Sequence, residues 1–272
     1  MNTIPKTIHY CWFGGNPLGE KELACIESWR RFLPDYKIVR WDESNFDVRS
    51  CSYASEAFDA TKWAFVSDYA RFKILFDHGG LYFDTDVEVI SPIDDIIAAG
   101  PFMGFETDCP GSGNNVDTLK GATTVAAGLG LSANPGLGLY KSILDSYSED
   151  HFVNSDGTLN KTTVVTRVTE ILLKYGLRDV PGIQKVAGVI IYPSEFFNPK
   201  SFLTGEINPT NNTRSIHHFS MSWLSDLERA QHDIMGHLLK LGFNHRAAEI
   251  LSRLIASIKM RDPSFIRQKL GI

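Results

Sequence analysis

The stretch SDYARFKILFDHGGLYFDTDV, residues 67–87, indicates how this chain folds. Its first half belongs to a segment in which apolar residues recur at helical spacing, so we predict a helix over Thr61–Asp77. The pair Gly79-Gly80 ends that helix, and the apolar residues Leu81–Phe83 then form a short buried strand. A helix that turns through glycines into a buried strand is typical of the α/β class.

The segments on both sides extend this pattern. Towards the N-terminus, a strand over Thr7–Phe13, a helix over Glu20–Phe32 and a strand over Tyr36–Trp41 indicate a parallel crossover unit. Towards the C-terminus the same signals predict strands over Val87–Ile90, Pro101–Glu106, Thr123–Ala127 and Val186–Tyr192, a strand or loop over Ser215–Phe219, and helices over Asn134–Tyr147, Lys161–Tyr175, Ser225–Leu241 and Arg246–Met260. We therefore predict one α/β domain over residues 1–240, with a central mixed, mostly parallel sheet flanked by helices, and a helical extension over 241–272.

Composition and charge narrow the function classes. The 272 residues are 43% hydrophobic and 22% charged, which excludes a largely disordered chain. The formal net charge of −5 argues against broad nucleic-acid binding. Residues 241–272 carry six basic and two acidic side chains, hence +4, which leaves −9 on the rest. A basic tail therefore follows an acidic body.

The cysteines and the apolar runs indicate a cytoplasmic protein. The four cysteines form no CxxC pair, which disfavours a structural zinc site and is typical of reduced, intracellular chains. The N-terminus shows no signal-peptide pattern. The uncharged run 121–140 contains too many glycines and hydroxyls to cross a membrane.

Two carboxylates, Asp84 and Asp86, directly follow the buried strand. Ligands of open α/β sheets bind at the carboxyl ends of the strands, where these side chains lie. A divalent cation that joins two repelling carboxylates to a diphosphate would relieve their repulsion, and oxygen ligands suit Mg²⁺ or Mn²⁺. An acidic pair alone is a weak signal, because such pairs are common in ordinary turns.

Three neighbouring residues strengthen the signal. Asp68 and Arg71 lie three residues apart and share one face of a helix that is otherwise mostly apolar, which favours a cleft over a surface ion pair. Arg71 can bind a phosphate or a sugar hydroxyl through its planar guanidinium. Tyr82 lies two residues before Asp84 on the strand, so both side chains point to the same face.

The motif W-F-G-G at residues 12–15, followed by the stretch 67–87, resembles glycosyltransferase family 32, which has a DXD sugar-binding region and includes capsular-polysaccharide and yeast outer-chain mannosyltransferases. The spacing of Asp68, Arg71, Tyr82 and the D-x-D pair is also similar to the catalytic domain of the large clostridial glucosylating toxins. The resemblance extends in order over about residues 1–225, and it is most specific over the quoted stretch.

This resemblance implies a GT-A-like fold and a retaining hexosyltransferase that takes a nucleoside diphosphate sugar, UDP-sugar rather than GDP-sugar, with Mn²⁺ or Mg²⁺. The implied acceptor is a glycan or a lipid-linked oligosaccharide in bacterial surface polysaccharide synthesis. The implied roles are base stacking by Trp12, donor-sugar contacts by Asp68 and Arg71, ribose or sugar contacts by Tyr82 and Asp84, and metal ligation by Asp84 and Asp86.

The segment HHFSMSW, residues 217–223, resembles a second family motif. It implies that His218 completes the metal shell, and the choice between His217 and His218 stays open. Ser222 and Trp223 would touch the diphosphate from a loop that closes over the donor, where the indole N–H of Trp223 can donate to a leaving-group oxygen.

One region departs from the family. Relatives often carry Asn or Gln on the strand that here reads TTVAA, residues 123–127. A contact to the sugar or the acceptor is then missing, or is supplied by Asn114 or Asn115. Glu106 and Asp108 are candidates for the acceptor side, with an ordinary polar loop as the alternative.

Three other interpretations of these motifs have weaker support from the sequence. The D-x-D also resembles haloacid-dehalogenase-type phosphatases, in which Asp84 would be the nucleophile, although Glu88 does not fit their pattern and the motif lies late in the chain. The run Gly128-x-Gly130-x-x-Ala133 mimics a dinucleotide fingerprint but lacks the later acidic residue. A sugar-nucleotide-binding module without turnover is the third alternative.

The last helix carries an apolar stripe formed by Ala247, Leu251, Leu254, Ile255 and Ile258, with basic residues around it. Such a stripe most commonly packs against the protein's own core. The alternative is peripheral contact of residues 246–269 with an anionic inner membrane surface.

Overall fold

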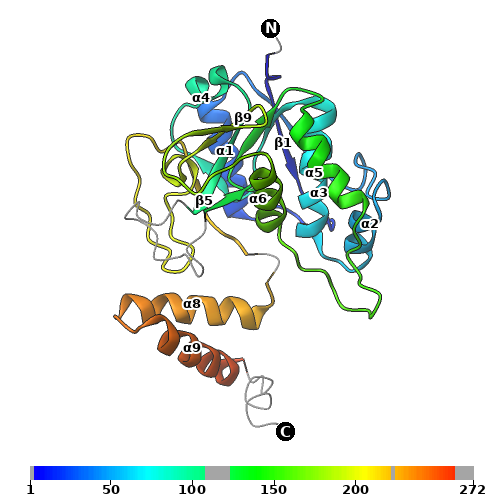
Figure 1. Ribbon diagram of the computed structural model, residues 1–272. Helices are drawn as coiled ribbons and strands as arrows, with labels where there is room; N and C mark the ends of the chain where they lie inside the picture. The colour runs from blue at the N-terminus through cyan, green and yellow to red at the C-terminus, as the bar shows by residue number, and fades with distance from the viewer. Residues whose placement is uncertain (1–2, 108–122, 222–223, 261–272) are drawn as a thin grey trace. The chain divides into compact units, whose positions relative to one another are not determined.

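A computed structural model describes residues 3–107, 123–221 and 224–260 (Figure 1). The chain divides into two compact units. Unit 1 consists of Met1–Pro199 and Asn208–His218, and unit 2 of Lys200–Ile207 and Phe219–Ile272. Each unit is described by itself.

Unit 1 alternates strands with helices, as the sequence predicts for an α/β fold. Its described elements are β1 (Thr7–Cys11), α1 (Glu20–Phe32), β2 (Lys37–Trp41), α2 (Ser52–Asp59), α3 (Trp63–His78), β3 (Gly80–Tyr82), β4 (Val87–Val89), α4 (Asp94–Ala99), β5 (Phe102–Thr107), β6 (Thr124–Ala126), β7 (Leu131–Ala133), α5 (Gly138–Ser148), α6 (Val164–Lys174), β8 (Gln184–Val186), β9 (Val189–Tyr192), α7 (Ser194–Phe197) and β10 (Ser215–His217).

The strands of unit 1 form a mixed arrangement. One four-stranded sheet has the order β2-β1-β3-β7, a second has the order β6-β5-β9-β8, and β10 pairs with β4. Ser132 on β7 connects the two larger sheets, because its hydroxyl accepts the backbone N–H of Phe102 on β5 at 3.1 Å. The predicted mixed α/β class is confirmed. In the sheet β2-β1-β3-β7 two of the three pairings are parallel, which matches the expected mixed, mostly parallel central sheet, and β5 also pairs parallel with β9.

The helix α3 and the strand β3 explain why the sequence stretch 67–87 organises the unit. Nearly every side of α3 is buried, which matches its apolar composition. Gly79 ends the helix at a positive φ of 64°, and a Cβ there would lie 2.6 Å from Pro135. Gly80 has a φ of 95°, and its Cβ would lie 2.6 Å from the carbonyl oxygen of Thr7. Both glycines are therefore required for the close turn that leads into the central strand.

Two predicted segments differ from the structure. The predicted strand Val186–Tyr192 is a hairpin, in which β8 and β9 are joined by Ala187 and Gly188, both at positive φ. The predicted helix over Asn134–Tyr147 begins only at Gly138, and the run before it contains the extra strand β7. The first segment forms a strand pair where the sequence shows one continuous apolar run. In the second region a strand comes before a shorter helix.

His9 on β1 is a buried structural histidine between three elements. Its Nδ1 accepts a hydrogen bond from the indole N–H of Trp41 at 3.0 Å, so its Nε2 carries the proton and donates to the carbonyl oxygen of Gly79 at 3.1 Å. Burial lowers the pKa of His9 from 6.5 to about 4, the Gly79 hydrogen bond opposes that shift, and His78 and Lys37 add to it.

We expect His9 to stay neutral until the pH approaches 4. Because its folded pKa lies below its unfolded value of 6.5, the stabilisation is complete above pH 6.5 and is lost as the pH falls towards 4. At about 1.4 kcal/mol per pKa unit the loss is about 3 kcal/mol. Imidazole NMR titration measures it, with His151 as the internal control, since the side-chain hydrogen bond to Glu56 raises its pKa. A His9 ring that protonates near pH 6.5 would contradict the assignment.

Unit 2 contains α8 (Asp226–Lys240) and α9 (His245–Lys259). The predicted capping box is present: the Ser225 hydroxyl accepts the N–H of Glu228, whose carboxylate accepts the N–H of Ser225. The sequence analysis assigned α8 to the domain over 1–240, whereas α8 lies in one compact unit with α9. In the described part of the chain, no helix combines the length and the hydrophobicity that crossing a membrane requires.

Candidate active site

The turn between β3 and β4 carries Asp84 and Asp86. β3 is an interior strand of its sheet, between β1 and β7, and the turn with the two aspartates follows its carboxyl end. β4 pairs antiparallel with β10 in a register that matches Val87 with His217, and the N–H of His218 donates to the carbonyl oxygen of Asp86 at 2.9 Å. This pairing brings a segment more than 120 residues later in the chain beside the D-x-D turn.

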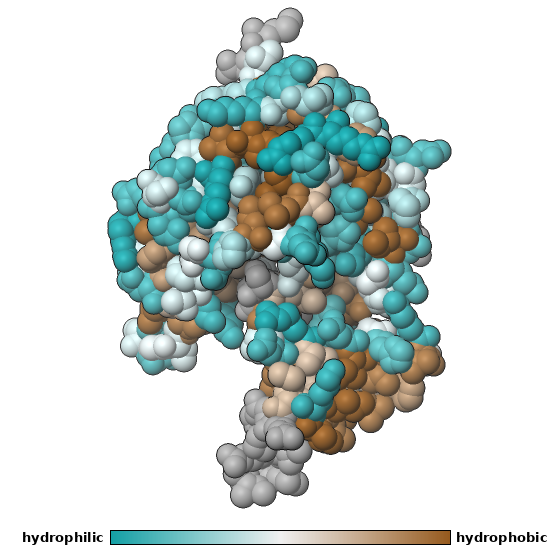
Figure 2. Space-filling view, turned by 180° about the vertical axis from the view of Figure 1, so that it is seen from behind, coloured by the Kyte–Doolittle hydropathy of each residue, from teal (hydrophilic) through white to brown (hydrophobic). Residues whose placement is uncertain are grey.

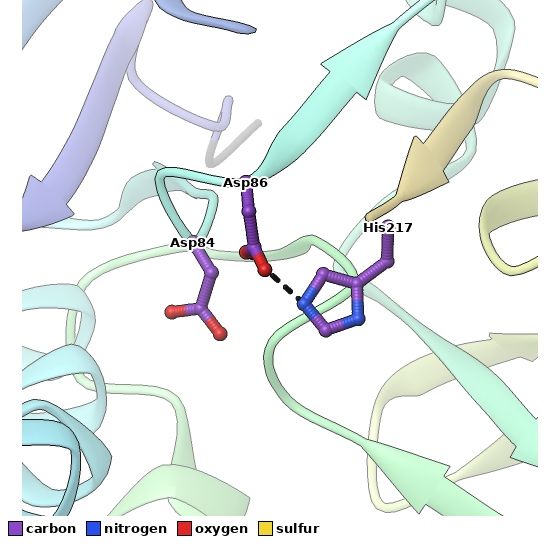
Figure 3. A group of neighbouring side chains, drawn as sticks. All are labelled: Asp84, Asp86 and His217. Carbon is purple, nitrogen blue, oxygen red and sulfur yellow. Dashed lines mark ion pairs between the residues drawn. The ribbon is translucent and has the colours of Figure 1, made fainter. Parts of the chain in front are cut away.

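Asp84, Asp86 and His217 form one cluster. One potential ligand atom from each lies within 4.8 Å of the others, and His217 Nε2 is 3.1 Å from Asp86 Oδ1. Figure 3 shows the three side chains turned towards one space, the two carboxylates from the β3–β4 turn and the imidazole from β10. Two carboxylate oxygens and one imidazole nitrogen fit Mn²⁺ well, and the oxygens also suit Mg²⁺.

The third member of the cluster differs from the residue that the resemblance implied. His218 Nε2 lies 2.9 Å from Glu88 Oε2, and both side chains are about one third or more exposed. Neighbouring residues on a strand point to opposite faces, so β10 turns one of the two histidines to the cluster and the other away. The geometry therefore replaces His218 with His217 as the candidate ligand.

Arg71 connects the helix α3 to the acidic turn. Its guanidinium is only 4% exposed, and Nη2 lies 2.9 Å from Asp68 Oδ1 and 3.3 Å from Asp84 Oδ1. The Tyr82 hydroxyl donates to Asp84 Oδ1 at 3.1 Å, and the guanidinium carbon of Arg71 lies 5.1 Å from the centre of the Tyr82 ring. The structure thus brings together the four residues that the sequence singled out around the D-x-D.

Burial and charge act against each other in this network. Burial raises the pKa of Asp68 to about 6, the charge of Asp84 adds to the rise, and Arg71 opposes it. Burial likewise raises the pKa of Asp84, with Asp86 adding and Arg71 opposing. Two of the three acidic side chains are therefore costly to ionise, and a cation at the cluster would stabilise their charged forms.

His217 has a raised pKa for the opposite reason. Burial alone would lower it, but the carboxylates of Asp86, Asp84 and Glu106 outweigh burial. Glu106 lies near the end of β5, so its side chain contributes to the negative potential of this cluster. This location agrees with the expectation that Glu106 lies near the site, although its role on the acceptor side stays a prediction.

The carboxyl end of β1 reaches the same edge. The parallel register matches His9 with Tyr82, which by continuation sets Cys11 level with Asp84 and Trp12 level with Thr85. Cys11 is buried, and its thiol interacts electrostatically with Arg71 and Tyr82. The sequence analysis did not include Cys11 in the site. Trp12 is partly exposed beside this edge, and its indole N–H donates to the carbonyl oxygen of Asn16 at 2.7 Å.

Gly128 is a further residue of the site that sequence reasoning set aside. A Cβ at this position would lie 2.3 Å from Asp84 Oδ2 and 3.6 Å from Arg71 Nη1. Its carbonyl oxygen accepts the N–H of Asp84 at 3.4 Å. The loop between β6 and β7 therefore forms a wall against Asp84, and only a residue without a side chain leaves that carboxylate in its position.

We expect Gly128→Ala to displace the Asp84 carboxylate and to destabilise the fold by about 1–3 kcal/mol, as overpacking does. The matched control is Gly138→Ala, because a Cβ there meets nothing within 4 Å. Urea unfolding of both variants, also in an Asp84→Ala background, measures the effect. The prediction requires the Gly128→Ala penalty to shrink when Asp84 is removed, and an unchanged penalty would refute it.

Several predicted site residues lie outside the described residues: Asp108, Asn114, Asn115, Ser222 and Trp223. Their roles stay predictions. The segment TTVAA, residues 123–127, contains β6, in which Val125 and Ala126 are buried. The segment contains no Asn or Gln, so it differs from the family pattern at this strand, as the sequence indicated.

With this geometry established, comparison with known proteins identifies the region. Residues 19–103 match the family described as "Glycosyltransferase sugar-binding region containing DXD motif". The chain carries a DXD-type sugar-binding region. The matched residues include α3, β3 and the turn with Asp84 and Asp86, whereas β10 with His217 lies outside the match.

Curated relatives match part of the chain. The chain is 27% identical over 122 residues to inositol phosphoceramide mannosyltransferase 1 of Schizosaccharomyces pombe, and 32% identical over 117 residues to inositol phosphoceramide mannosyltransferase 3 of the same organism. Each alignment covers 42% of this chain, but only 38% and 32% of the relatives. The chain therefore spans less than two fifths of the length of these curated relatives.

Solved structures also match. The PaToxG glycosyltransferase has a TM-score of 0.42 at 18% identity, with coverage of 63% of this chain and 69% of the other. The galactosyltransferase LgtC, solved with donor and acceptor sugar analogues, has a TM-score of 0.40 at 14% identity, with coverage of 70% and 74%.

Proposed function

We propose that this chain is a metal-dependent glycosyltransferase with a GT-A-type catalytic unit. It moves a hexosyl unit from a nucleoside diphosphate sugar, UDP-sugar in preference to GDP-sugar, to a hydroxyl of a glycan acceptor. The observation that carries the proposal is the cluster of Asp84, Asp86 and His217 beside the Arg71 network, in which both aspartates and Arg71 lie within the match to a DXD-type sugar-binding region.

Asp84, Asp86 and His217 are the residues that would hold a divalent cation. When bound, Mn²⁺ or Mg²⁺ supplies positive charge next to the diphosphate leaving group. His217 is included because its register on β10 turns it to the two carboxylates. His218 pairs with Glu88 in this proposal, and the pair links β10 to β4 beside the cluster.

Asp68 and Arg71 orient the donor sugar in this proposal. Arg71 is fixed by two carboxylates and by its hydrogen bond to the carbonyl oxygen of Ser67, so it offers its remaining N–H groups in a set direction. A positioned guanidinium binds hydroxyls or phosphate oxygens at little cost in side-chain entropy. Trp12, at the neighbouring strand end, is the proposed stacking surface for the base.

The reaction breaks the bond between the anomeric carbon and the diphosphate oxygen and forms a bond from that carbon to the acceptor hydroxyl oxygen. The hydroxyl proton leaves with the departing diphosphate. We favour retention by attack on the same face, because the sequence analysis singled out no side chain as a covalent nucleophile. Ser222 and Trp223 are proposed to donate hydrogen bonds to the leaving group.

The acceptor that we propose is a glycan or a lipid-linked oligosaccharide in surface polysaccharide synthesis, reached from the cytoplasmic side. The two curated relatives are named for a lipid acceptor, inositol phosphoceramide, which supports an acceptor of this kind. Glu106, Asp108, Asn114 and Asn115 are the proposed acceptor side.

A screen of sugar nucleotides by mass spectrometry tests the proposed function. The full chain is incubated with UDP- and GDP-sugars and Mn²⁺, with and without EDTA, and the release of nucleoside diphosphate is measured. We expect release from at least one donor that stops in EDTA. Binding of a donor without turnover would instead support a non-catalytic sugar-nucleotide module. Cleavage of the diphosphate into nucleoside monophosphate and sugar 1-phosphate would support phosphoryl chemistry that uses Asp84.

The two histidines offer a sharp comparison. We expect His217→Ala to lower metal-dependent turnover by about ten- to one-hundred-fold, because it removes a ligand, and His218→Ala to change it less than three-fold. Turnover measured over a range of Mn²⁺ concentrations distinguishes them, since loss of a ligand shifts the metal dependence. The reverse order of effects would return His218 to the metal shell.

A further inference from the structure

The second helix of unit 2, α9, packs through its small residues. Ala248, Ser252 and Ala256 are buried and recur every four residues, so they form one line along the helix. Ala248 belongs to the core of unit 2 together with Leu203, Met235 and Leu238. Small side chains allow two helices to approach closely, so this line of residues can pack α9 against α8 to form a helical hairpin.

Leu251 packs against the core of unit 2, whereas other large apolar side chains of α9 are exposed. Ile250 is 53% exposed, Leu254 38% and Ile258 63%, and the turn before the helix adds the exposed Leu241 and Phe243. Figure 2 shows hydrophobic residues gathered over the hairpin. Single exposed apolar residues are ordinary, but a continuous row of them marks a surface that binds something.

Basic residues border this row on both sides. At 100° per residue, Arg246 and Arg253 fall next to Ile250, and Lys259 falls next to Ile255. The one acidic residue of α9, Glu249, forms an ion pair with Arg253 at 2.7 Å. An apolar row between two basic edges is the pattern of a helix that lies in the plane of a membrane surface.

We propose that the exposed face of α9, with the turn residues Leu241 and Phe243, docks unit 2 on an anionic phospholipid bilayer. The charges fit this occupant: residues 241–272 carry +4 and the rest of the chain −9, so an anionic surface attracts residues 241–272 and repels the acidic remainder. A second copy of the chain fits less well, because a two-fold contact through this row would set basic edges against each other.

Vesicle sedimentation of the full chain tests the proposal without any substrate, so its outcome is independent of the proposed function. We expect binding to phosphatidylglycerol-rich vesicles at low salt, at least ten-fold weaker binding at high salt, and little binding to phosphatidylcholine alone. Equal binding to both lipids, or no binding to either, would overturn the proposal.

Two variant pairs locate the surface. Leu254→Ser with Ile258→Ser should weaken binding at least ten-fold, whereas Leu23→Ser with Leu173→Ser, both 52% exposed on unit 1, should not. Arg246→Gln with Lys259→Gln should weaken it about thirty-fold, at about 1 kcal/mol per charge, and Lys21→Gln with Lys185→Gln should have a smaller effect.

Melting temperature and sedimentation velocity of the same variants exclude the other occupants. The proposal requires Leu254→Ser with Ile258→Ser to leave both the melting temperature and the monomer mass unchanged. A drop in melting temperature would show that the row packs against the protein itself. Loss of a dimer would show that it binds a second copy.

Discussion

Asp86→Asn should abolish nearly all sugar transfer while the protein folds normally. The substitution removes one charged ligand from the cluster of Asp84, Asp86 and His217. Loss of such a ligand removes several kcal/mol of transition-state stabilisation, which corresponds to about a thousand-fold fall in kcat/KM. Folding should not suffer, because Asp86 is one of the charges that raise the pKa of Asp84 and its removal relieves that repulsion.

Glu88→Gln is the matched control for that experiment. Glu88 lies two residues further along the chain, on β4, but its carboxylate faces His218 rather than the cluster. We expect less than a three-fold change in kcat/KM for this variant, measured with the donor that the screen identifies. An Asp86→Asn enzyme as active as Glu88→Gln would exclude the cluster as the metal site.

Arg71→Met should have the largest effect on stability. The guanidinium is almost fully buried between Asp68 and Asp84, so its removal leaves the buried carboxylate of Asp68 and the partly buried carboxylate of Asp84 without their cation. Breaking a buried ion pair in this way costs about 3–5 kcal/mol. The control is Arg49→Met, whose pair with Asp59 is more than half exposed, so its loss should change the free energy of unfolding little.

Urea unfolding at pH 7 measures both free energies. Arg71→Met with Asp68→Asn should recover part of the loss, because the second change neutralises one of the stranded carboxylates. Equal stability of Arg71→Met and Arg49→Met would mean that the network around Arg71 contributes nothing to folding.

Local signals predicted the elements that depend on nearby residues. The helix α1 has the bounds that its apolar spacing gave, and the capping box at Ser225 begins α8. The strand β7 was missed, because Leu131–Ala133 lies in a glycine-rich run without periodicity and becomes a strand only by pairing with β3. Strand pairing is a tertiary property, which explains why a three-residue strand without a local signal went unpredicted.

The same distinction holds at the candidate site. Asp68, Arg71, Tyr82, Asp84 and Asp86 lie within nineteen consecutive residues, so helix and strand periodicity sufficed to predict that they meet. The choice of His217 over His218 depends on the register of β10 against β4, which no local pattern specifies. Gly128 enters the site only because a distant loop folds back on Asp84.

The most direct test of the central proposal is the fate of a sugar nucleotide followed by ³¹P and ¹H NMR, with the full chain and Mg²⁺ at neutral pH. Mg²⁺ is used here because Mn²⁺ broadens the signals. We expect the nucleoside diphosphate to appear together with a sugar product that first has the donor's anomeric configuration, and no reaction in EDTA. Nucleoside monophosphate and sugar 1-phosphate as the first products, or a donor unchanged with Mg²⁺ here and with Mn²⁺ in the mass-spectrometric screen, would contradict the proposal that this cluster transfers a sugar.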